Sequence, residues 1–254
     1  MHFQKANDFW LKTNPMVTNW CADIKREVLK GLRPEAEEKL FDIRQKSPSA
    51  VFYPIYTALI EERPVSFSSG KMIKSFKQTF LSLDLQSPRW SSVETMAKDY
   101  ELRQYETAKW VSTVIQGETQ KEAMRQGFWK LFHYIQGKNE KEMKIDMTVP
   151  VTCLIKSGCA DFKISFFVPF EHQDSPPQPT DSDVFIEERK AAAVFVRSFG
   201  GFASPEKYAD EAEVLARTLR NRGQPFHEDF FYTAGYDSPF KLFNRHNEVW
   251  YFKK

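Results

Sequence analysis

The sequence lacks the long apolar stretches on which membrane helices and secretion signals depend. No segment of the 254-residue chain approaches the ~18 uninterrupted apolar residues of a membrane span. The first residues, MHFQKANDFWLKTNP, contain no charged region followed by an apolar run, so they do not resemble a signal peptide. They are also not rich in Arg and Ser, as a transit peptide would be. We therefore expect a cytoplasmic protein.

The chain also has few cysteines, and its positive and negative charges nearly balance. The 3 cysteines are few and odd in number, which fits a reducing compartment better than a disulfide framework. Cys153 and Cys159 flank a short turn and could pair if oxidised, but free buried thiols are the expected state. The net charge of +2, without a basic stripe, gives no reason to expect nucleic acid as a partner.

The motifs of the common enzyme classes are missing. The sequence contains no nucleophile elbow, phosphate loop, dinucleotide fingerprint or zinc-ligand spacing, and its histidines are scattered along the chain. We therefore predict a protein that is not an enzyme. Aromatic residues, in contrast, make up 15% of the chain and include 23 Phe, so pockets lined by rings are expected.

One segment, TQKEAMRQGFWKLFHYIQG from Thr119 to Gly137, carries both a helix start and a helix stop. Thr119 with Glu122 forms a capping box, and Gly137 supplies the left-handed residue that ends a helix. Apolar residues recur between them at three- and four-residue spacing, which predicts one face packed on a sheet. They are Met124, Phe128, Leu131 and Ile135.

A second apolar set on this helix contains Trp129 and Phe132, with Arg125 on the same side and His133 at its edge. The apolar arc covers more than half of the helix, against the usual ~100° stripe of a surface helix. Core on both sides is one explanation. The alternative is that the second face lines a ligand site, because flat aromatic rings with a cation at the rim suit a large, planar, anionic ligand.

Residues 1–87 form the first predicted region, a helical N-terminal extension. Its last predicted helix carries Lys71, Lys74 and Lys77 beside an apolar face. Such a basic, amphipathic helix could lie on an anionic membrane surface or dock a protein partner, or it could pack on its own domain with its lysines in water.

Residues 88–254 form the second predicted region, in which strands and helices follow the same order twice. Ala108 and Ala192 occupy like positions in the two halves, as do Thr119 and Ser204, which each begin a helix. Two strand–strand–helix–strand–strand units predict an α+β fold, a distorted antiparallel β-barrel or saddle with one helix on each half. Strands are expected at 100–115 (as a pair), 144–155 with Pro150 at an edge or bulge, 162–169, 184–188, 192–199, 230–234 and 248–252.

Several stretches of this second region resemble the SOUL/heme-binding protein family. They are YETAKWVST from Tyr105, YIQGKNEKEMKIDMTVPVT from Tyr134, DVFIEERKAAAVFVRSFGGF from Asp183, YTAGYDSPFKL from Tyr232 and NRHNEVW from Asn244. They occur in the family's order and cover about residues 98 to 254. The resemblance implies a distorted β-barrel of two pseudo-repeats with two helices, and binding of heme or a related porphyrin rather than catalysis.

The resemblance also implies a groove beside the first helix. Matching the chain through YIQG and NEVW places groove positions on Arg125, Phe132, His133 and Lys241. Phe132 and Trp129 would contact the macrocycle, and Arg125 and Lys241 would pair with its carboxylates. His133 would ligate the iron or hydrogen-bond a propionate.

The sequence departs from the family at one position. A close member of the family carries a His, proposed as an iron ligand, just before the Tyr of the first strand, where this chain has Gln104. Either His133 replaces that ligand, or heme is held without a strong axial ligand. Two other interpretations stay open: an interaction module that has lost heme binding, and an enzyme acting on porphyrins or lipids in the same groove.

Overall fold

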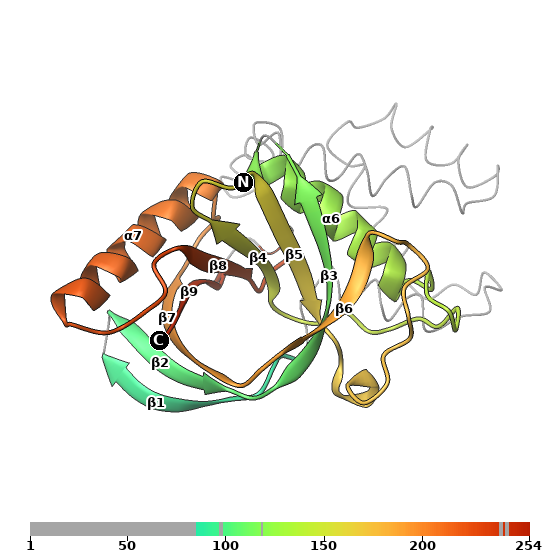
Figure 1. Cartoon of the computed structure of the whole chain (residues 1–254), viewed down its shortest axis with the longest axis horizontal. Helices are drawn as coiled ribbons and strands as arrows, with labels where there is room; N and C mark the ends of the chain where they lie inside the picture. The colour runs from blue at the N-terminus through green and yellow to red at the C-terminus, as the bar shows by residue number, and fades with distance from the viewer. Residues whose placement is uncertain (1–84, 97–98, 118, 239–240, 242–243) are drawn as a thin grey trace, which may run out of the picture. The chain divides into compact units, whose positions relative to one another are not determined.

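The computed structural model describes residues 85–96, 99–117, 119–238, 241 and 244–254, so the helices predicted within residues 1–84 lie outside the described residues. Within these ranges the chain forms strands, two long α-helices and one short 3-10 helix (Figure 1). In chain order they are β1 (Trp90–Met96), β2 (Tyr100–Tyr105), β3 (Ala108–Gln116), α6 (Gln120–Ile135), β4 (Val151–Lys156), β5 (Asp161–Phe167), η1 (Phe170–His172), β6 (Val184–Arg189), β7 (Ala192–Phe199), α7 (Pro205–Asn221), β8 (Phe230–Gly235) and β9 (Asn247–Phe252).

All of the described strands join one antiparallel sheet, in the order β1-β2-β7-β9-β8-β4-β5-β3-β6. The order is symmetric about the β8–β4 pair, because β9 and β5, β7 and β3, and β2 and β6 occupy matching places on the two sides. The predicted repeat of two similar halves is therefore confirmed, and β1 is the strand that has no counterpart in the other half.

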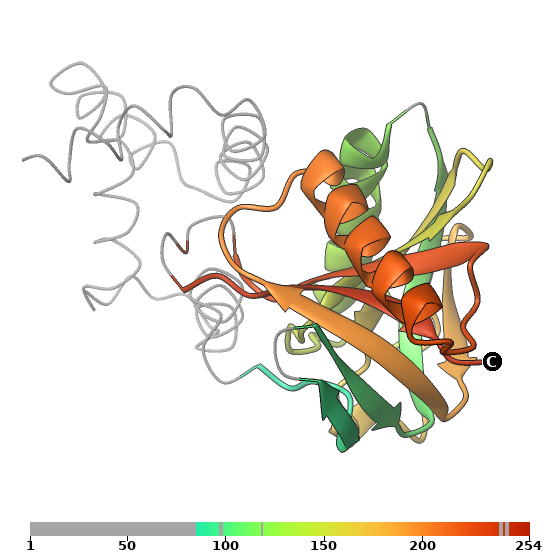
Figure 2. The same cartoon turned by 90° about the vertical axis from the view of Figure 1, so that its left-hand side faces the viewer.

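The sheet curls into a distorted barrel because β2 leads almost directly into β3 and β6 into β7, so the chain crosses twice between the two halves of the sheet. Only Glu106 and Thr107 separate β2 from β3, and only Lys190 and Ala191 separate β6 from β7, although these strands lie far apart in the sheet order. The Ala191 N–H donates to Thr107 Oγ1 at 2.9 Å, which joins the two crossing points. Figures 1 and 2 show the curled sheet with α6 and α7 on its outside.

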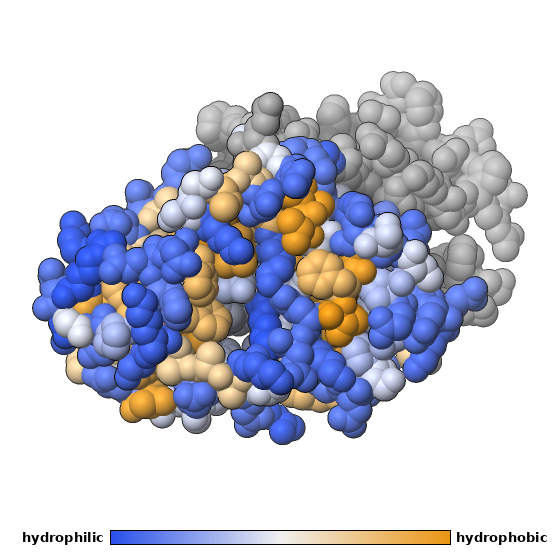
Figure 3. Space-filling model, viewed as in Figure 1, coloured by the Kyte–Doolittle hydropathy of each residue, from blue (hydrophilic) through white to orange (hydrophobic). Residues whose placement is uncertain are grey.

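The sheet thus has an outer face under the helices and an inner face on the concave side. Figure 3 shows that much of the surface in this view is hydrophilic and that apolar side chains reach it in small groups, one of them over β3 and β6. None of the described helices is long and apolar enough to cross a membrane.

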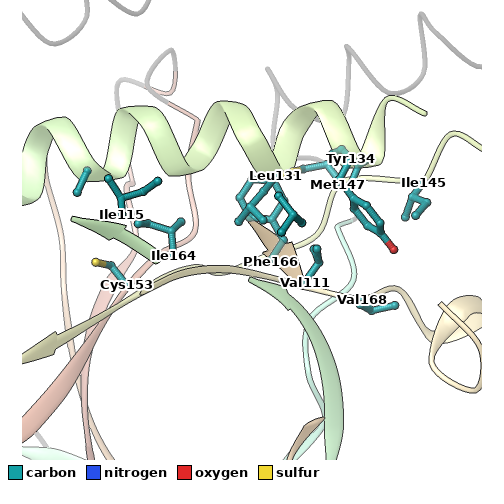
Figure 4. Close-up of a cluster of buried hydrophobic side chains, with 13 residues drawn as sticks. Val111, Ile115, Leu131, Tyr134, Ile145, Met147, Cys153, Ile164, Phe166 and Val168 are labelled. Atoms are coloured by element: carbon teal, nitrogen blue, oxygen red, sulfur yellow. The ribbon is translucent and has the colours of Figure 1, made fainter. Parts of the chain in front are cut away.

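Each helix closes its own hydrophobic core on the outer face. Beneath α6, buried side chains of the helix pack on β3, β4 and β5, and Figure 4 shows Leu131 and Tyr134 above Ile164 and Phe166. Beneath α7, Leu215 and Leu219 pack with Phe195 and other residues of β2, β7 and β9. The alternation of residues along each strand fixes which side chains face these cores.

The helix boundaries agree with the predictions. The Glu122 N–H donates to Thr119 Oγ1 at 3.3 Å, and Gly137 has a φ of 116° just past the end of α6. Ser204 caps α7 in the same way through the Lys207 N–H, with Pro205 at the first helical position. The local signals were sufficient here because a cap is made by residues only three positions apart.

Two predictions about the strands were wrong, and one strand was missed. The segments 100–105 and 108–116 do not pair with each other, because β2 pairs with β1 and β7 while β3 pairs with β5 and β6. Pro150 does not lie in an edge strand or a bulge: it precedes β4, a central strand, since a residue without an N–H cannot donate to the ladder. The strand β1 was not predicted at all.

The prediction of buried thiols holds for one of the two described cysteines. Cys153 lies in the core beneath α6, and Cys159 is exposed in the turn before β5. Both are free. Burial raises the pKa of the Cys153 thiol to about 12, so it behaves as a small apolar side chain at neutral pH.

Gly127 allows α6 to approach the sheet closely, and filling its place is expected to destabilise the protein. A Cβ at Gly127 would lie 2.8 Å from Ile164 Cδ1 and 3.0 Å from Ile164 Cβ. Gly127→Val should lower the free energy of unfolding by about 1–3 kcal/mol, measured by urea denaturation. The loss should shrink when Ile164→Val removes the nearest carbon atom, and wild-type stability of Gly127→Val would show that the helix shifts away without cost.

Candidate ligand-binding face of helix α6

Helix α6 has a buried face toward the sheet and a half-buried aromatic face beside it. The buried residues are Ala123, Gly127, Leu131, Tyr134 and Ile135. Beside it lie Trp129, Phe132 and His133 of the second predicted set, together with Phe128, which the spacing had assigned to the sheet face; all four are partly exposed. We call these four residues the aromatic face. Core packing accounts for part of their burial, since Phe128 and Phe132 pack against the core beneath α6.

The rings of the aromatic face contact one another in an ordered arrangement. Phe128 and Phe132 stack with centroids 5.8 Å apart and planes 14° apart. Trp129 lies edge-on to Phe132 at 5.5 Å, and the His133 ring is 6.2 Å from Trp129. Phe128 also contacts Phe166 of β5 at 5.4 Å, which ties the face to the core. The result is a set of rings held in place by the sheet beneath them.

The indole N–H of Trp129 is a buried donor without an acceptor among the described residues. A buried N–H that makes no hydrogen bond costs about 1–3 kcal/mol, so natural structures rarely leave one unpaired. An acceptor supplied by a ligand, such as a carboxylate oxygen, would satisfy it.

Helix α7 provides an internal comparison, because it occupies the matching place in the other half. Counted from the two N-caps, the positions of Phe128 and Phe132 are held in α7 by Glu213 and Arg217, which are both exposed. A helix in this position therefore needs no aromatic outer face in order to pack on its half of the sheet.

Arg125 lies one turn before Trp129 on the same side of α6, as the helical spacing predicted. Its guanidinium forms an ion pair with Glu122 at 2.6 Å, and both side chains are exposed. Hydrogen bonds from Arg125 and Gln126 lower the pKa of the Glu122 carboxyl. Arg125 is therefore a cation at the rim whose present partner, a surface carboxylate, could be exchanged for another one at little cost.

Lys241 lies in the loop between β8 and β9, far in sequence from α6. Its ammonium group binds Asp237 Oδ1 at 2.5 Å, and Asp237 is buried, whereas the lysine is about one-third exposed, at 36%. Arg245 braces the same loop by donating to the carbonyls of Ser238 and Lys241 at 2.6 Å. The described contacts of Lys241 thus hold its own loop together, and its predicted place at the groove stays a prediction.

Gln104 lies in β2, which pairs with β1 and β7, whereas α6 packs on β3, β5 and β6. Its side chain is exposed, and its amide donates to the Tyr105 carbonyl at 3.3 Å. Among the residues that the structure describes, no group of three or more His, Cys, Asp or Glu side chains could hold a metal ion. The chain's imidazole at the aromatic face is that of His133.

A charged cluster on the inner face of the sheet was missed by sequence reasoning. Glu248 is 1% exposed and accepts hydrogen bonds from Arg103 at 3.0 Å and from Tyr236, His246 and Trp250, each at 2.7 Å. Burial by itself raises the pKa of Glu248, but the His246 hydrogen bond and the Arg103 charge outweigh it and lower that pKa. The sequence offered only a Glu near the start of β9, after Asn247, and a charged residue in a strand is ordinarily assigned to an exposed face.

The family model and the curated relatives point to the same family. The family model described as SOUL heme-binding protein matches residues 85–252. Heme-binding protein 2 of Mus musculus is 47% identical over 178 residues, which cover 67% of this chain and 87% of the relative. Heme-binding protein 2 of Homo sapiens is 48% identical with the same coverage. Heme-binding protein 1 of Mus musculus is 35% identical over 172 residues, covering 65% of this chain and 90% of the relative.

Proposed function

Because the chain belongs to the SOUL heme-binding protein family, we propose that it binds heme or a related porphyrin on the aromatic face of α6. The observation that carries this proposal is the pairing of ordered, half-buried rings with the unpaired Trp129 N–H. Heme combines a flat apolar body with carboxylates, and the aromatic face offers a matching surface for each part. The proposed role is binding without catalysis, as in the names of the relatives.

The apolar part of this site consists of Phe132 and Trp129. Their planes are 89° apart, so one ring can lie against the macrocycle while the other contacts its edge. Phe128 supports both from beneath through its contact with Phe166. Bound non-covalently here, heme would contribute its own redox and ligand-binding chemistry, and the protein would supply the apolar surface that excludes water from it.

The polar part of the site would receive the propionates. The Trp129 N–H can donate to one carboxylate oxygen, and Arg125 can exchange Glu122 for a propionate with a more specific geometry. Lys241 would take part if its ammonium group left Asp237 and turned toward α6. In this proposal Arg125 and Trp129 are the main anchors, and Lys241 is the weaker one because its cation already binds a buried carboxylate.

A hemin titration of the purified full-length chain tests the proposal. We expect a saturable Soret change with a stoichiometry of one hemin per chain, since α7 carries Glu213 and Arg217 in place of the second set of rings. Trp129→Phe keeps the ring area but removes the N–H, so affinity should fall about fivefold to tenfold. Absence of a saturable change would refute heme binding and favour the interpretation as an interaction module.

The second test concerns His133, the candidate iron ligand. His133 lies in the last turn of α6 beside Trp129, at the edge of the aromatic face rather than over its centre. We expect it to contact the rim of the ligand, so His133→Ala should leave the Soret position unchanged and lower affinity only modestly. A clear spectral shift in His133→Ala at neutral pH would instead show ligation, which should then weaken below about pH 6.5, where imidazole becomes protonated.

The predictions about cellular location and further partners go beyond the heme site. A cytoplasmic location is supported by the free state of Cys153 and Cys159 and by the small number of cysteines in the chain. Docking of a membrane surface or a protein through the N-terminal basic helix concerns residues outside the described ranges, and it stays a prediction from the sequence.

A further inference from the structure

The strand β6 forms one end of the sheet. It pairs with β3 through residues Val184 to Arg189, and within the described ranges no strand lies on its other side. An edge strand of this kind presents backbone N–H and C=O groups that can pair with a further strand. Such an edge is either protected against pairing or able to receive a further strand.

The direction of the backbone groups of β6 follows from its partner. Lys109 of β3 directs its N–H to Gln173 Oε1 at 2.7 Å and its carbonyl to the Val168 N–H at 3.1 Å, both on the side away from β6. Neighbouring residues alternate, so Ala108, Trp110 and Ser112 point toward β6 and bond their partners there. Their partners are Arg189, Glu187 and Phe185.

The remaining residues of β6 therefore point their backbone groups outward. The Val184 N–H is used by a turn, since it donates to the Asp181 carbonyl at 3.1 Å. The N–H and C=O groups of Ile186 and Glu188 face away from the sheet and form a row about two residues apart. This is the spacing at which an antiparallel strand makes its hydrogen bonds.

The other half of the barrel shows what fills the same place. The strand β2 corresponds to β6, and its matching edge is covered by β1, a strand of seven residues. The Glu106 N–H donates to the Arg89 carbonyl at 3.1 Å across that pair. By the symmetry of the sheet, a strand in the position of β1 would lie on the outward edge of β6.

The part of the chain that the structure describes supplies no strand there. The segment before β6 that corresponds to β1 is DSPPQPT, residues 174–180, and proline can neither donate to a ladder nor follow a regular strand geometry. The two edges of the sheet also differ in protection. In β1 the register shifts between Ser92 and Glu94, a bulge that blunts the edge, whereas β6 runs in unbroken register with β3.

The side chains beside the open edge of β6 are not those expected of an edge that is protected against strand pairing. Phe185 is 38% exposed on the inner-face side of β6, beside Val114 of β3, which is 43% exposed. These residues belong to the strands over which Figure 3 shows apolar surface. On the opposite side of β6, Glu188 is exposed and interacts with Lys190. An apolar contact and a carboxylate are thus available, one on each side of the backbone.

We propose that the edge of β6 binds an extended peptide of a partner protein by antiparallel strand addition, with an apolar residue opposite Phe185 and a basic residue opposite Glu188. The two positions are three residues apart, so they lie on opposite sides of the strand, as the alternation requires. The basic residue is favoured because a lysine or arginine can pair with Glu188 across the two strands.

A second copy of this chain is a poorer occupant. When two copies of β6 pair in antiparallel fashion, residues whose backbone groups point outward must lie opposite each other. The two-fold axis of the pair then passes through a single residue, which lies opposite its own copy. A centre at Glu187 or Glu188 places two carboxylates opposite each other, and a centre at Arg189 places two guanidinium groups opposite each other. A centre at Ile186 places Glu187 opposite Phe185, and a centre at Phe185 places Glu187 opposite Asp183. Each arrangement is unfavourable, since like charges and charge–apolar pairs weaken a ladder.

The probe for the test is a capped peptide, acetyl-Thr-Lys-Thr-Val-Val-Thr-amide, which aligns lysine with Glu188 and valines with Ile186 and Phe185. Two methylated versions serve as a matched pair. In the blocking peptide, the lysine and the first valine carry N-methyl groups, so the N–H groups aimed at β6 are lost. In the control peptide, the second threonine and the second valine are methylated, and these N–H groups point away from β6.

Binding is followed by the amide chemical shifts of the isotope-labelled full-length protein. We expect saturable shifts centred on residues 184–190, with similar affinity for the control peptide and an affinity about tenfold or more lower for the blocking peptide, because two ladder hydrogen bonds are removed. In the protein, Glu188→Pro removes an outward N–H without breaking a bond to β3 and should abolish binding. Glu188→Ala, which keeps that N–H, should weaken binding only modestly.

Several results would overturn this proposal. They are shifts centred elsewhere, no saturable shift up to the solubility limit of the peptide, or equal affinity of the blocking and control peptides. Concentration-dependent dimerisation that Glu188→Pro abolishes would assign the edge to a second copy of the chain instead. Hemin binding is expected to be unchanged in both Glu188 variants, so failure here is distinguishable from failure of the proposed heme site.

Discussion

Replacing Glu248 by alanine is expected to lower the free energy of unfolding by about 3–5 kcal/mol, because it takes one of two carboxylates from a buried cation, whose other partner is Glu101 at 2.8 Å, and leaves buried donors unpaired. Arg103 is only 6% exposed, and its guanidinium lies 3.0 Å from Glu248 Oε1. The substitution also removes the acceptor of the Tyr236 hydroxyl and the Trp250 indole N–H. Urea denaturation followed by fluorescence measures the loss.

A double-mutant cycle with Arg103→Met separates the charge from the cavity. With Arg103 already replaced by an apolar side chain, Glu248→Ala no longer takes a carboxylate from a buried charge, so it should cost about 1–3 kcal/mol less than in the wild type. Glu248→Gln is the shape-matched control, since it keeps an acceptor oxygen for Tyr236 and Trp250. Additive losses in the cycle would show that Arg103 reaches water when Glu248 is absent.

The same cluster predicts a dependence of stability on pH. The pKa of Glu248 is lower in the folded protein than its ordinary value, so folding favours the ionised carboxylate. The stability that this group contributes is therefore present above the ordinary carboxyl pKa of about 4.3 and is lost as the pH falls through the lower, folded value. Glu248→Gln should flatten this part of the stability profile.

The inner face shows why part of the structure could not be predicted. Arg103 of β2 and Glu248 of β9 have counterparts in the other half, where Glu187 of β6 binds Lys163 of β5. Each half thus holds an ion pair at the same place with the two charges exchanged. Sequence comparison of the halves cannot find such a pair, because the residues that correspond are opposite in charge and lie far apart in the chain.

Features that depend on neighbouring residues were predicted more successfully. The caps of α6 and α7, the faces of both helices and the order of the repeated strands follow from local spacing. The pairing of strands does not, because β2 and β3 are consecutive in sequence and lie near opposite ends of the sheet. The strand β1, WSSVETM, lacks regular alternation, and it forms because β2 offers it a partner.

The same difference between local and long-range features separates what could be predicted of the candidate site from what could not. Arg125, Trp129, Phe132 and His133 were found together because one helix carries them, and the structure keeps them on one side of α6. The unpaired N–H of Trp129 could not be inferred, since burial of a single atom depends on the packing around it. The ion pair of Lys241 with Asp237 is local in sequence, at four residues' separation, but its loop conformation is not.

Arg125→Glu combined with Lys241→Gln is expected to reduce hemin affinity at least tenfold. Each charge-assisted hydrogen bond to a propionate is worth on the order of 1.5–3 kcal/mol, and a glutamate at position 125 adds repulsion. Glutamine rather than glutamate is chosen at position 241, because a second carboxylate beside the buried Asp237 would disturb the loop itself. Soret titrations of the variant and the wild type give the ratio of the dissociation constants.

The single variants and a charge-matched control decide which cation acts. Lys121→Glu changes the net charge as much as Arg125→Glu does, on an exposed position of the same helix, and should leave hemin affinity within about twofold. Because the Arg125 ion pair with Glu122 is exposed whereas Lys241 must leave a buried carboxylate, most of the loss should come from Arg125→Glu. If Lys121→Glu weakens binding as much, only long-range charge attracts hemin; if neither Arg125→Glu nor the double variant weakens it, the propionates bind away from α6.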